Sequence, residues 1–252
     1  MTTTDSPRSS VAVVTGAGNG LGRAITRALL DDGHMVVLAG RTRASLQDTA
    51  ADHPRAEVVV ADVTSASSVR ALFASAWALH GRVDVLVNNA GVFGPEGAID
   101  EVEDGHWHDV LAANVTGSFL CAREAVRIMR RQRPRGGRII NSGSLSAHVP
   151  RPHSVAYTVS KHAITGLTAA MNLDLRDHGI ACTQLDVGNA ATAMTAGIGV
   201  EALQPDGTRR AEPTIDPVDV ARLVAHVVSL PLEVNVPSLT VMARTMPYAG
   251  RG

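Results

Sequence analysis

The segment Val11-Ala12-Val13-Val14-Thr15-Gly16-Ala17-Gly18-Asn19-Gly20-Leu21-Gly22 determines the expected fold. An apolar run leads into a glycine-rich turn, and a helical apolar pattern follows as far as Gly33. This order predicts a strand, a turn and a helix. Unpaired amides at a helix start bind anions, and glycines let the backbone approach a pyrophosphate. The spacing fits neither the G-x-G-x-x-G form nor a P-loop, so the prediction depends on the turn's place between the first strand and the first helix.

The rest of the chain alternates between apolar runs and helical patterns. Further strands are expected at residues 35–39, 58–63, 83–87, 138–141, 180–185 and 239–243, and helices at 65–80, 105–131, 154–178 and 216–230. With the first strand, this predicts an α/β fold: one doubly wound Rossmann-type domain, with a seven-stranded parallel sheet and helices on both faces. Ligands in such folds bind at the carboxyl ends of the strands.

No composition break divides the chain, so we expect a flexible terminus at 1–10 and one catalytic domain at 11–252. A loop at about 193–211 has no strong periodicity, and long loops of this kind are usually lids or binding loops. It is the expected substrate loop. The tail at 246–252 carries no motif whose role follows from its residues.

Composition excludes several classes of protein. Apolar residues make up 45% of the chain and the net charge is −1, which argues against disorder and gives no electrostatic reason to expect nucleic-acid binding. No apolar run reaches about 18 residues, so no membrane span is expected. Cys121 and Cys182 form no disulfide or metal pattern and are expected in the core, and His106 and His108 are expected to be a surface pair. We therefore expect a soluble, cytoplasmic protein without a metal site.

The end of the second strand indicates which dinucleotide binds. An acid in this position binds the ribose 2′-hydroxyl in many nucleotide folds. Here the position holds Gly40, and Arg41 follows it. Glycine leaves room for a 2′-phosphate, and an arginine can bind that phosphate with two parallel hydrogen bonds. The pair favours NADP(H) over NAD(H); the alternative is that Arg41 only begins a solvated turn.

Two polar groups follow the next strands. Asp62 can accept a hydrogen bond from an adenine amino group, or it can simply start a turn. The sequence Asn88-Asn89-Ala90-Gly91 suits a close backbone bend beside a ligand, and on its own could equally be a turn.

Tyr157 and Lys161 are four residues apart in the expected helix 154–178 and therefore share one helix face. A free tyrosine titrates near ~10. A fixed positive charge favours the phenolate and moves the group towards the range of general acid/base catalysis. Lys161 is the one lysine of the chain, and an arginine cannot easily replace a compact ammonium close to a phenol and a ribose. The alternatives are an ordinary solvated helix face and chance in an arginine-biased composition.

These motifs, in this order, resemble those of the short-chain dehydrogenase/reductase family over essentially the whole chain. Ser144, thirteen residues before Tyr157, falls where the family places its serine, and Asn114 matches the asparagine of its long interface helix. Two departures stand out: the usual Ser-Ser pair reads Gly143-Ser144, and the usual Pro-Gly after the sixth strand reads Val187-Gly188.

The resemblance implies the roles of the site residues. Tyr157 would exchange the proton, Lys161 would lower its pKa and bind the nicotinamide ribose, Ser144 would polarise the substrate oxygen, and Asn114 would hold a water. The expected NADP(H)-binding residues are Gly16, Asn19, Gly20, Leu21, Gly22, Arg41, Asp62, Val63, Asn89, Ala90, Gly91, Tyr157, Lys161, Ala190 and Thr192. The resemblance also implies a homotetramer, paired through the helices that carry Asn114 and Tyr157 and through the last helix and strand.

The expected substrate pocket is mostly apolar, with no dense cationic cluster. Its walls are Phe93, Leu145, His148, Val149, His153 and Met194, with the loop 193–211. This lining favours a mid-sized, weakly polar ketone, and therefore an oxidoreductase that passes hydride between nicotinamide and a carbonyl/alcohol pair. The alternatives are a 3-oxoacyl thioester reductase and a regulator that senses NADP(H) without turnover.

Overall fold

The sheet contains seven parallel strands, as the sequence predicts. The computed structural model describes residues 10–248, so almost all of the expected flexible terminus 1–10, and the last residues of the tail, lie outside the described residues. The strands are β1 Val11–Thr15, β2 Met35–Gly40, β3 Ala56–Val60, β4 Val85–Asn88, β5 Gly137–Ser142, β6 Ile180–Val187 and β9 Ser238–Val241. Their order is β3-β2-β1-β4-β5-β6-β9, and every neighbouring pair is parallel.

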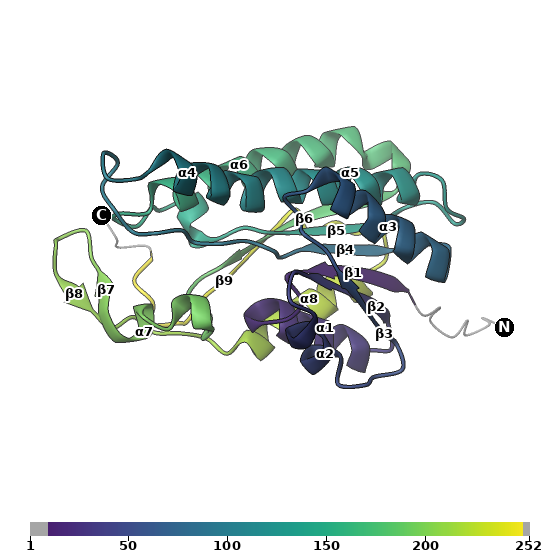
Figure 1. The fold of residues 1–252 in the computed structure, drawn as a ribbon, viewed down its shortest axis with the longest axis horizontal. Helices are drawn as coiled ribbons and strands as arrows, with labels where there is room; N and C mark the ends of the chain where they lie inside the picture. The colour runs from purple at the N-terminus through teal and green to yellow at the C-terminus, as the bar shows by residue number, and fades with distance from the viewer. Residues whose placement is uncertain (1–9, 249–252) are drawn as a thin grey trace.

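Helices cover both faces of this sheet. They are α1 Gly20–Asp31, α2 Arg43–Ala50, α3 Ala66–His80, α4 Asp104–Leu111, α5 Gly117–Met129, α6 Val155–Asp174, α7 Ile198–Glu201 and α8 Pro217–Ser229. In Figure 1, α3, α5 and α6 lie above the sheet, and α1, α2 and α8 lie below it. The predicted doubly wound architecture is confirmed.

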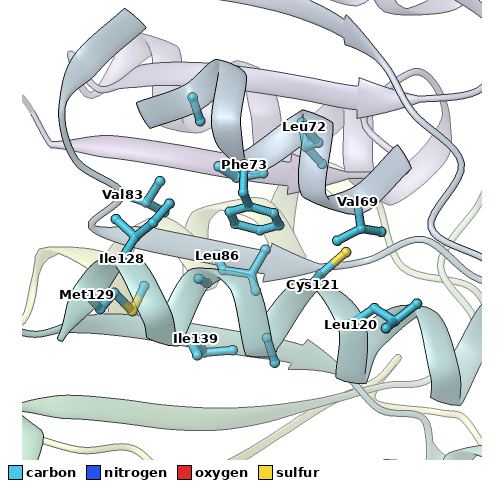
Figure 2. Packing of buried hydrophobic residues seen from close by; sticks show 14 of the residues in the cluster. Val69, Leu72, Phe73, Val83, Leu86, Leu120, Cys121, Ile128, Met129 and Ile139 are labelled. Carbon is cyan, nitrogen blue, oxygen red and sulfur yellow. The ribbon is translucent and has the colours of Figure 1, made fainter. Parts of the chain in front are cut away.

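Each face of the sheet has its own core, because successive strand residues point to opposite faces. Val13 and Val37 pack on the α3–α5–α6 side, and their neighbours Val14 and Leu38 pack on the other. Figure 2 shows the first core, in which the ring of Phe73 on α3 points towards Leu86 and Ile139 lies beyond Leu86. Strands that are buried on both faces read as continuous apolar runs, which is why the sequence reveals them.

Both cysteines lie in the first core, as predicted. Burial raises the pKa of Cys121 to about 12, and the nearby Glu124 carboxylate adds to the shift. Burial likewise raises the pKa of Cys182 to about 12, although the charge of Arg138 opposes it. Neither thiol therefore has the thiolate character of a reactive cysteine. Within residues 10–248, no helix is long and apolar enough to cross a membrane.

Some elements differ from the expectation. Helix α2 was not predicted, because its buried residues are Leu46, Thr49 and Ala50, which make a weak apolar stripe. The third strand ends at Val60 rather than 63, since the amide of Asp62 donates to the Ser68 hydroxyl instead of continuing the ladder. The loop 193–211 contains a 3₁₀ turn at Ala193–Thr195, helix α7, and an antiparallel pair of two-residue strands, β7 Ala202–Leu203 and β8 Arg209–Arg210.

Candidate active site

A cavity of about 390 Å³ opens at the carboxyl ends of the strands, where the strand order reverses between β1 and β4. This switch point is where doubly wound sheets bind their ligands. Every predicted cofactor residue lines the cavity except Gly22. The structure thus gathers into one site segments that are far apart in the sequence.

The glycine turn and the Asn88–Gly91 motif are joined by hydrogen bonds. The Thr15 hydroxyl accepts the main-chain N–H groups of Asn89 and Ala90, both at 3.1 Å. The Asn89 side chain donates to the carbonyls of Thr15 and Gly16 at 3.1 and 3.3 Å. Gly16 has a φ of +64°, and a Cβ there would lie 2.9 Å from the Cα of Ala90. The motif therefore holds the turn in place as well as lining the cavity.

Gly22 has a packing role. A Cβ on this residue would overlap the carbonyl oxygen of Gly16, so only glycine lets α1 approach the turn this closely. The residue sets the position of the helix start that opens onto the cavity, and does not itself line it.

The far end of the cavity is lined by Gly40, Arg41, Thr42 and Ser45. Arg41 is exposed and is available to a ligand there. Asp62 accepts hydrogen bonds from the amide and hydroxyl of Thr64 at 2.9 and 2.8 Å. These bonds lower the pKa of Asp62, and the charge of Arg41 contributes to the same shift. Asp62 therefore starts the turn and also lines the cavity. The turn role does not exclude a hydrogen bond from an adenine amino group.

Tyr157 and Lys161 lie on the cavity side of α6 and not on a solvated face. The buried Lys161 ammonium lies 5.4 Å from the centre of the Tyr157 ring and donates to the carbonyl of Ser142 at 2.7 Å. The Phe93 ring packs on the Tyr157 ring with centroids 4.7 Å apart. The strand end thus fixes the ammonium, and an aromatic neighbour fixes the phenol.

Asn114 lies in a π-helical turn, Ala112–Thr116, that separates α4 from α5 in place of the single helix expected at 105–131. Its amide donates to the carbonyl of Val92 and to the Ser160 hydroxyl, both at 2.9 Å, and accepts from the N–H of Val92 at 2.8 Å. The Ser160 hydroxyl donates to the carbonyl of Tyr157 at 2.7 Å. Single π-helical turns occur often at functional sites. Here the turn lets a mid-helix asparagine connect the cavity wall to the helix that carries Tyr157.

Ser144 follows the cavity-lining Gly143 but does not itself line the cavity. It is buried at the start of the 3₁₀ turn Leu145–Ala147, where its Oγ accepts the N–H of Ser146 at 3.1 Å. Its own N–H donates to the Asp186 carboxylate at 2.9 Å. Asp186 lies on the neighbouring strand β6 and was not singled out in the sequence.

The expected substrate residues lie in different surroundings. Met194 lines the cavity, and Phe93 packs on Tyr157. Leu145 is buried against Ala243 and Met246, which places it in a small core rather than in the cavity wall. Three further residues, His148, Val149 and His153, lie in the segment between Ser144 and α6 and do not line the cavity.

A buried polar network joins this segment to the expected substrate loop. Arg151 forms a salt bridge with Glu212, whose side chain is 2% exposed, and also donates to Asn189 at 2.8 Å. Asn189 and Gln204 donate to the Glu212 carboxylate at 2.8 and 3.0 Å. The network ties both ends of the loop to the segment before α6. In Figure 1 the loop, with α7 and the β7–β8 pair, lies at the end of the molecule opposite the beginning of β1.

We expect this network to make stability depend on acidity. Burial by itself raises the pKa of Glu212, but the hydrogen bonds from Arg151, Asn189 and Gln204 outweigh it and lower the pKa from 4.5 to about 2. Since the folded state binds this proton less tightly, the contribution is complete above about pH 4.5 and is lost as the pH falls towards 2.

Urea unfolding between pH 7 and pH 3 measures this dependence. The free energy of unfolding of Glu212→Gln should fall less over that range than that of the unaltered protein. Glu201→Gln, which removes an exposed carboxylate in the same loop, serves as the matched control and should follow the unaltered protein. An unchanged acid dependence in Glu212→Gln would contradict the role given to the network.

Comparison with known proteins identifies the family of this chain. The family model described as short chain dehydrogenase matches residues 10–202. A 3beta-hydroxysteroid dehydrogenase of Mediterraneibacter gnavus is 35% identical over 192 residues, which are 73% of this chain and 67% of that protein.

Two solved structures are similar to this one over more than nine tenths of the chain. An actinorhodin polyketide ketoreductase with NADPH has a TM-score of 0.82 at 30% identity, and the match covers 93% of this chain and 96% of that one. A 3-ketoacyl-(acyl-carrier-protein) reductase from Brucella melitensis with NADH has a TM-score of 0.82 at 25% identity, covering 92% and 96%. Because the family model matches well over half of the 252 residues, the protein belongs to the short-chain dehydrogenase/reductase family.

Proposed function

We propose that residues 11–252 form one catalytic domain that transfers hydride between NADP(H) and a carbonyl/alcohol pair, acting as a ketone reductase. One observation carries this proposal: the Lys161 ammonium, anchored on the Ser142 carbonyl, lies 5.4 Å from the centre of the Tyr157 ring at the wall of the cavity. The pair places a phenolic proton donor and a cation together at the cavity, as general acid/base catalysis at a bound substrate requires.

The cavity suits a dinucleotide. The start of α1 opens onto it, so unpaired helix amides are available to a pyrophosphate. Gly16 and Gly20 both have positive φ, and a Cβ on either would lie within 3.2 Å of Ala90 or Thr192. These glycines leave a cradle that side chains would fill. When bound there, the nicotinamide supplies or accepts the hydride.

The residues of the chain would then transfer the proton and hold the cofactor and the substrate. Tyr157 donates the proton to the substrate oxygen in reduction and removes it in oxidation. Lys161 binds the nicotinamide ribose and holds its positive charge on the same helix face as the phenol. Ser144 holds the substrate oxygen. The Asn114 side chain is hydrogen-bonded to Val92 and Ser160 and so positions the helix that carries Tyr157. Its Oδ1 atom can accept one more hydrogen bond and would hold a water.

The preference for NADP(H) rests on Gly40 and Arg41 at the far end of the cavity. The matched structures do not decide between the two cofactors, since the ketoreductase holds NADPH and the 3-ketoacyl reductase holds NADH. The exposed Arg41 guanidinium can bind a 2′-phosphate, and Gly40 places no carboxylate against it.

A ketone is the substrate class that we favour, because the expected substrate residues nearest to Tyr157 and the cavity, Phe93 and Met194, are apolar. The names of the two structural relatives also favour the alternative of a 3-oxoacyl thioester. A turnover screen with NADPH across simple ketones, β-keto esters, diketones and a 3-oxoacyl thioester distinguishes these classes by loss of NADPH absorbance. NADPH binding without turnover on any of them would favour a cofactor-sensing regulator.

We further propose a homotetramer in the cytoplasm, a compartment that suits two free buried thiols. Large apolar side chains stay exposed on the helices expected at the interfaces: Phe119 is 47% exposed, Val159 41%, Leu173 67% and Val218 47%. Exposed apolar patches of this kind mark association surfaces. Light scattering at micromolar concentration should give four times the chain mass of 26.3 kDa. A monomer would overturn the proposal, and Leu173→Glu should dissociate the assembly.

A further inference from the structure

A buried carboxylate lies against the backbone of Ser144 and has no part in the mechanism above. Asp186, near the end of β6, has 1% of its surface exposed. Its Oδ1 atom accepts the N–H of Ser144 at 2.9 Å. The Gln184 amide donates to both of its oxygens at 2.8 and 2.9 Å, and Nε2 of His148 lies 2.8 Å from Oδ2. These bonds hold the carboxylate in one orientation, with Oδ1 directed at the Ser144 amide.

Gly143 leaves the room that this carboxylate needs. A Cβ on Gly143 would overlap Oδ1 of Asp186 and would lie 3.0 Å from the Gln184 side chain. Gly143 is not among the glycines with positive φ, so its backbone conformation does not itself require glycine. The missing side chain at position 143 therefore serves the approach of Asp186 to the next residue, Ser144.

The hydrogen bonds around Ser144 leave one of its donors free. Its N–H donates to Asp186, and its carbonyl accepts the N–H of Ala147 at 2.9 Å. Its Oγ atom accepts the N–H of Ser146 at 3.1 Å. A hydroxyl also has one hydrogen to donate, and within residues 10–248 no acceptor receives this one. Since Gly143 lines the cavity, the free Oγ–H belongs to the residue that directly follows the cavity wall.

We propose that Asp186 is a positioning residue that acts through Ser144. The last main-chain bond from β5 to β6 is the N–H of Gly143 to the carbonyl of Leu185, at 2.8 Å. At Ser144 the chain leaves the sheet for the 3₁₀ turn 145–147, and the Asp186 side chain replaces the next main-chain acceptor. The carboxylate thereby fixes the backbone from which the serine hydroxyl donates to the substrate oxygen. This inference rests on the proposed function, and adds to it a residue that touches neither substrate nor cofactor.

A double-mutant cycle tests whether Asp186 acts through Ser144. The rates are measured with NADPH and the ketone that the turnover screen reduces fastest. Asp186→Leu keeps the shape of the side chain and removes the acceptor. It should lower kcat about 10- to 100-fold, as a displaced catalytic group does, and leave the KM for NADPH nearly unchanged. In a Ser144→Ala background the same substitution should lower kcat by less than about twofold, because no hydroxyl is left to position. Equal losses in both backgrounds would overturn the inference.

Three further variants separate positioning from stability. Asp186→Asn keeps an oxygen for the Ser144 N–H and should recover most of the kcat that Asp186→Leu loses. Gln184→Met removes two hydrogen bonds to the carboxylate and leaves the one to Ser144, so it should lower the melting temperature with little change in kcat. Gly143→Ala combined with Asp186→Ala places a methyl group in the space of the carboxylate and supplies no acceptor. This pair should stay as slow as Asp186→Leu, and recovery of its kcat would show that Asp186 only fills space.

Amide hydrogen exchange tests the contact without turnover. The Ser144 N–H should exchange slowly in the unaltered protein and in Asp186→Asn. In Asp186→Leu it should exchange about tenfold faster, which corresponds to the loss of one hydrogen bond. The neighbouring N–H of Gly143, which is bound to Leu185, is the matched control and should not change. Equal exchange of the Ser144 N–H in all three proteins would overturn the inference. If the exchange rates differ as expected and the unaltered protein reduces no ketone of the screen, the proposed ketone reductase is wrong instead.

Discussion

Tyr157→Phe is expected to lower kcat by about 10²–10⁴-fold, the range supplied by a positioned proton donor. The substitution removes the phenolic oxygen and keeps the ring, so the packing against Phe93, with centroids 4.7 Å apart, is preserved. The Lys161 ammonium also keeps its bond to the Ser142 carbonyl at 2.7 Å. NADPH binding should therefore stay nearly intact, as measured by fluorescence titration of the reduced cofactor.

The other tyrosine of the chain gives a matched control. Tyr248 lies partly buried against the Leu145–Met246 cluster, and Tyr248→Phe should retain activity. Lys161→Ala should reduce both turnover and NADPH affinity, because the ammonium serves the phenol and the ribose. If Tyr157→Phe kept most of its activity, Tyr157 would not be the proton donor.

Arg41→Ala is expected to weaken NADPH binding by roughly ten- to a hundredfold and to leave NADH binding nearly unchanged. A hydrogen bond to a charged group contributes about 1.5–3 kcal/mol, which corresponds to that range of affinity. Asn19, on the glycine turn, supplies no second positive charge, so the preference of the unaltered protein should be moderate. Competition titrations with the two reduced cofactors measure it.

The neighbouring Arg43 is exposed and does not line the cavity, so Arg43→Ala is the matched control. Gly40→Asp combined with Arg41→Ile should shift the preference towards NADH. The new side chain must find room, because a Cβ at Gly40 would lie 3.3 Å from Leu46. Tighter binding of NADH than NADPH by the unaltered protein would show that Arg41 only begins a solvated turn.

The sheet and much of the cofactor cavity could be predicted because their signals are local. Buried strands such as Val11–Thr15 are continuous apolar runs, and the glycine turn follows directly. Tyr157 and Lys161 lie one helical turn apart, so their proximity follows from helix geometry alone. The residue types in these segments were therefore sufficient to place the strand ends and to bring Tyr157 and Lys161 together.

Other features depend on contacts between distant segments. Nothing near position 22 shows that a Cβ there would overlap Gly16, and nothing near Gly143 reveals Asp186, more than forty residues later. The π-helical turn at Asn114 forms because its amide finds Val92 and Ser160 on other elements. The substrate residues were the least predictable, since the segment after Ser144 has no periodicity that indicates which side chains face the cavity.

Hydride transfer from the cofactor to a carbonyl carbon is the central claim, and isotope transfer measures it directly. The unaltered protein would be incubated with NADPH that carries deuterium on the transferring face of C4, together with each carbonyl compound of the screen. Mass spectrometry of the products should find one deuterium on the carbinol carbon of at least one alcohol, and far less of that product after the same time with Tyr157→Phe. Binding of NADPH with no deuterium in any product would contradict the account and favour a regulator that senses the cofactor without turnover.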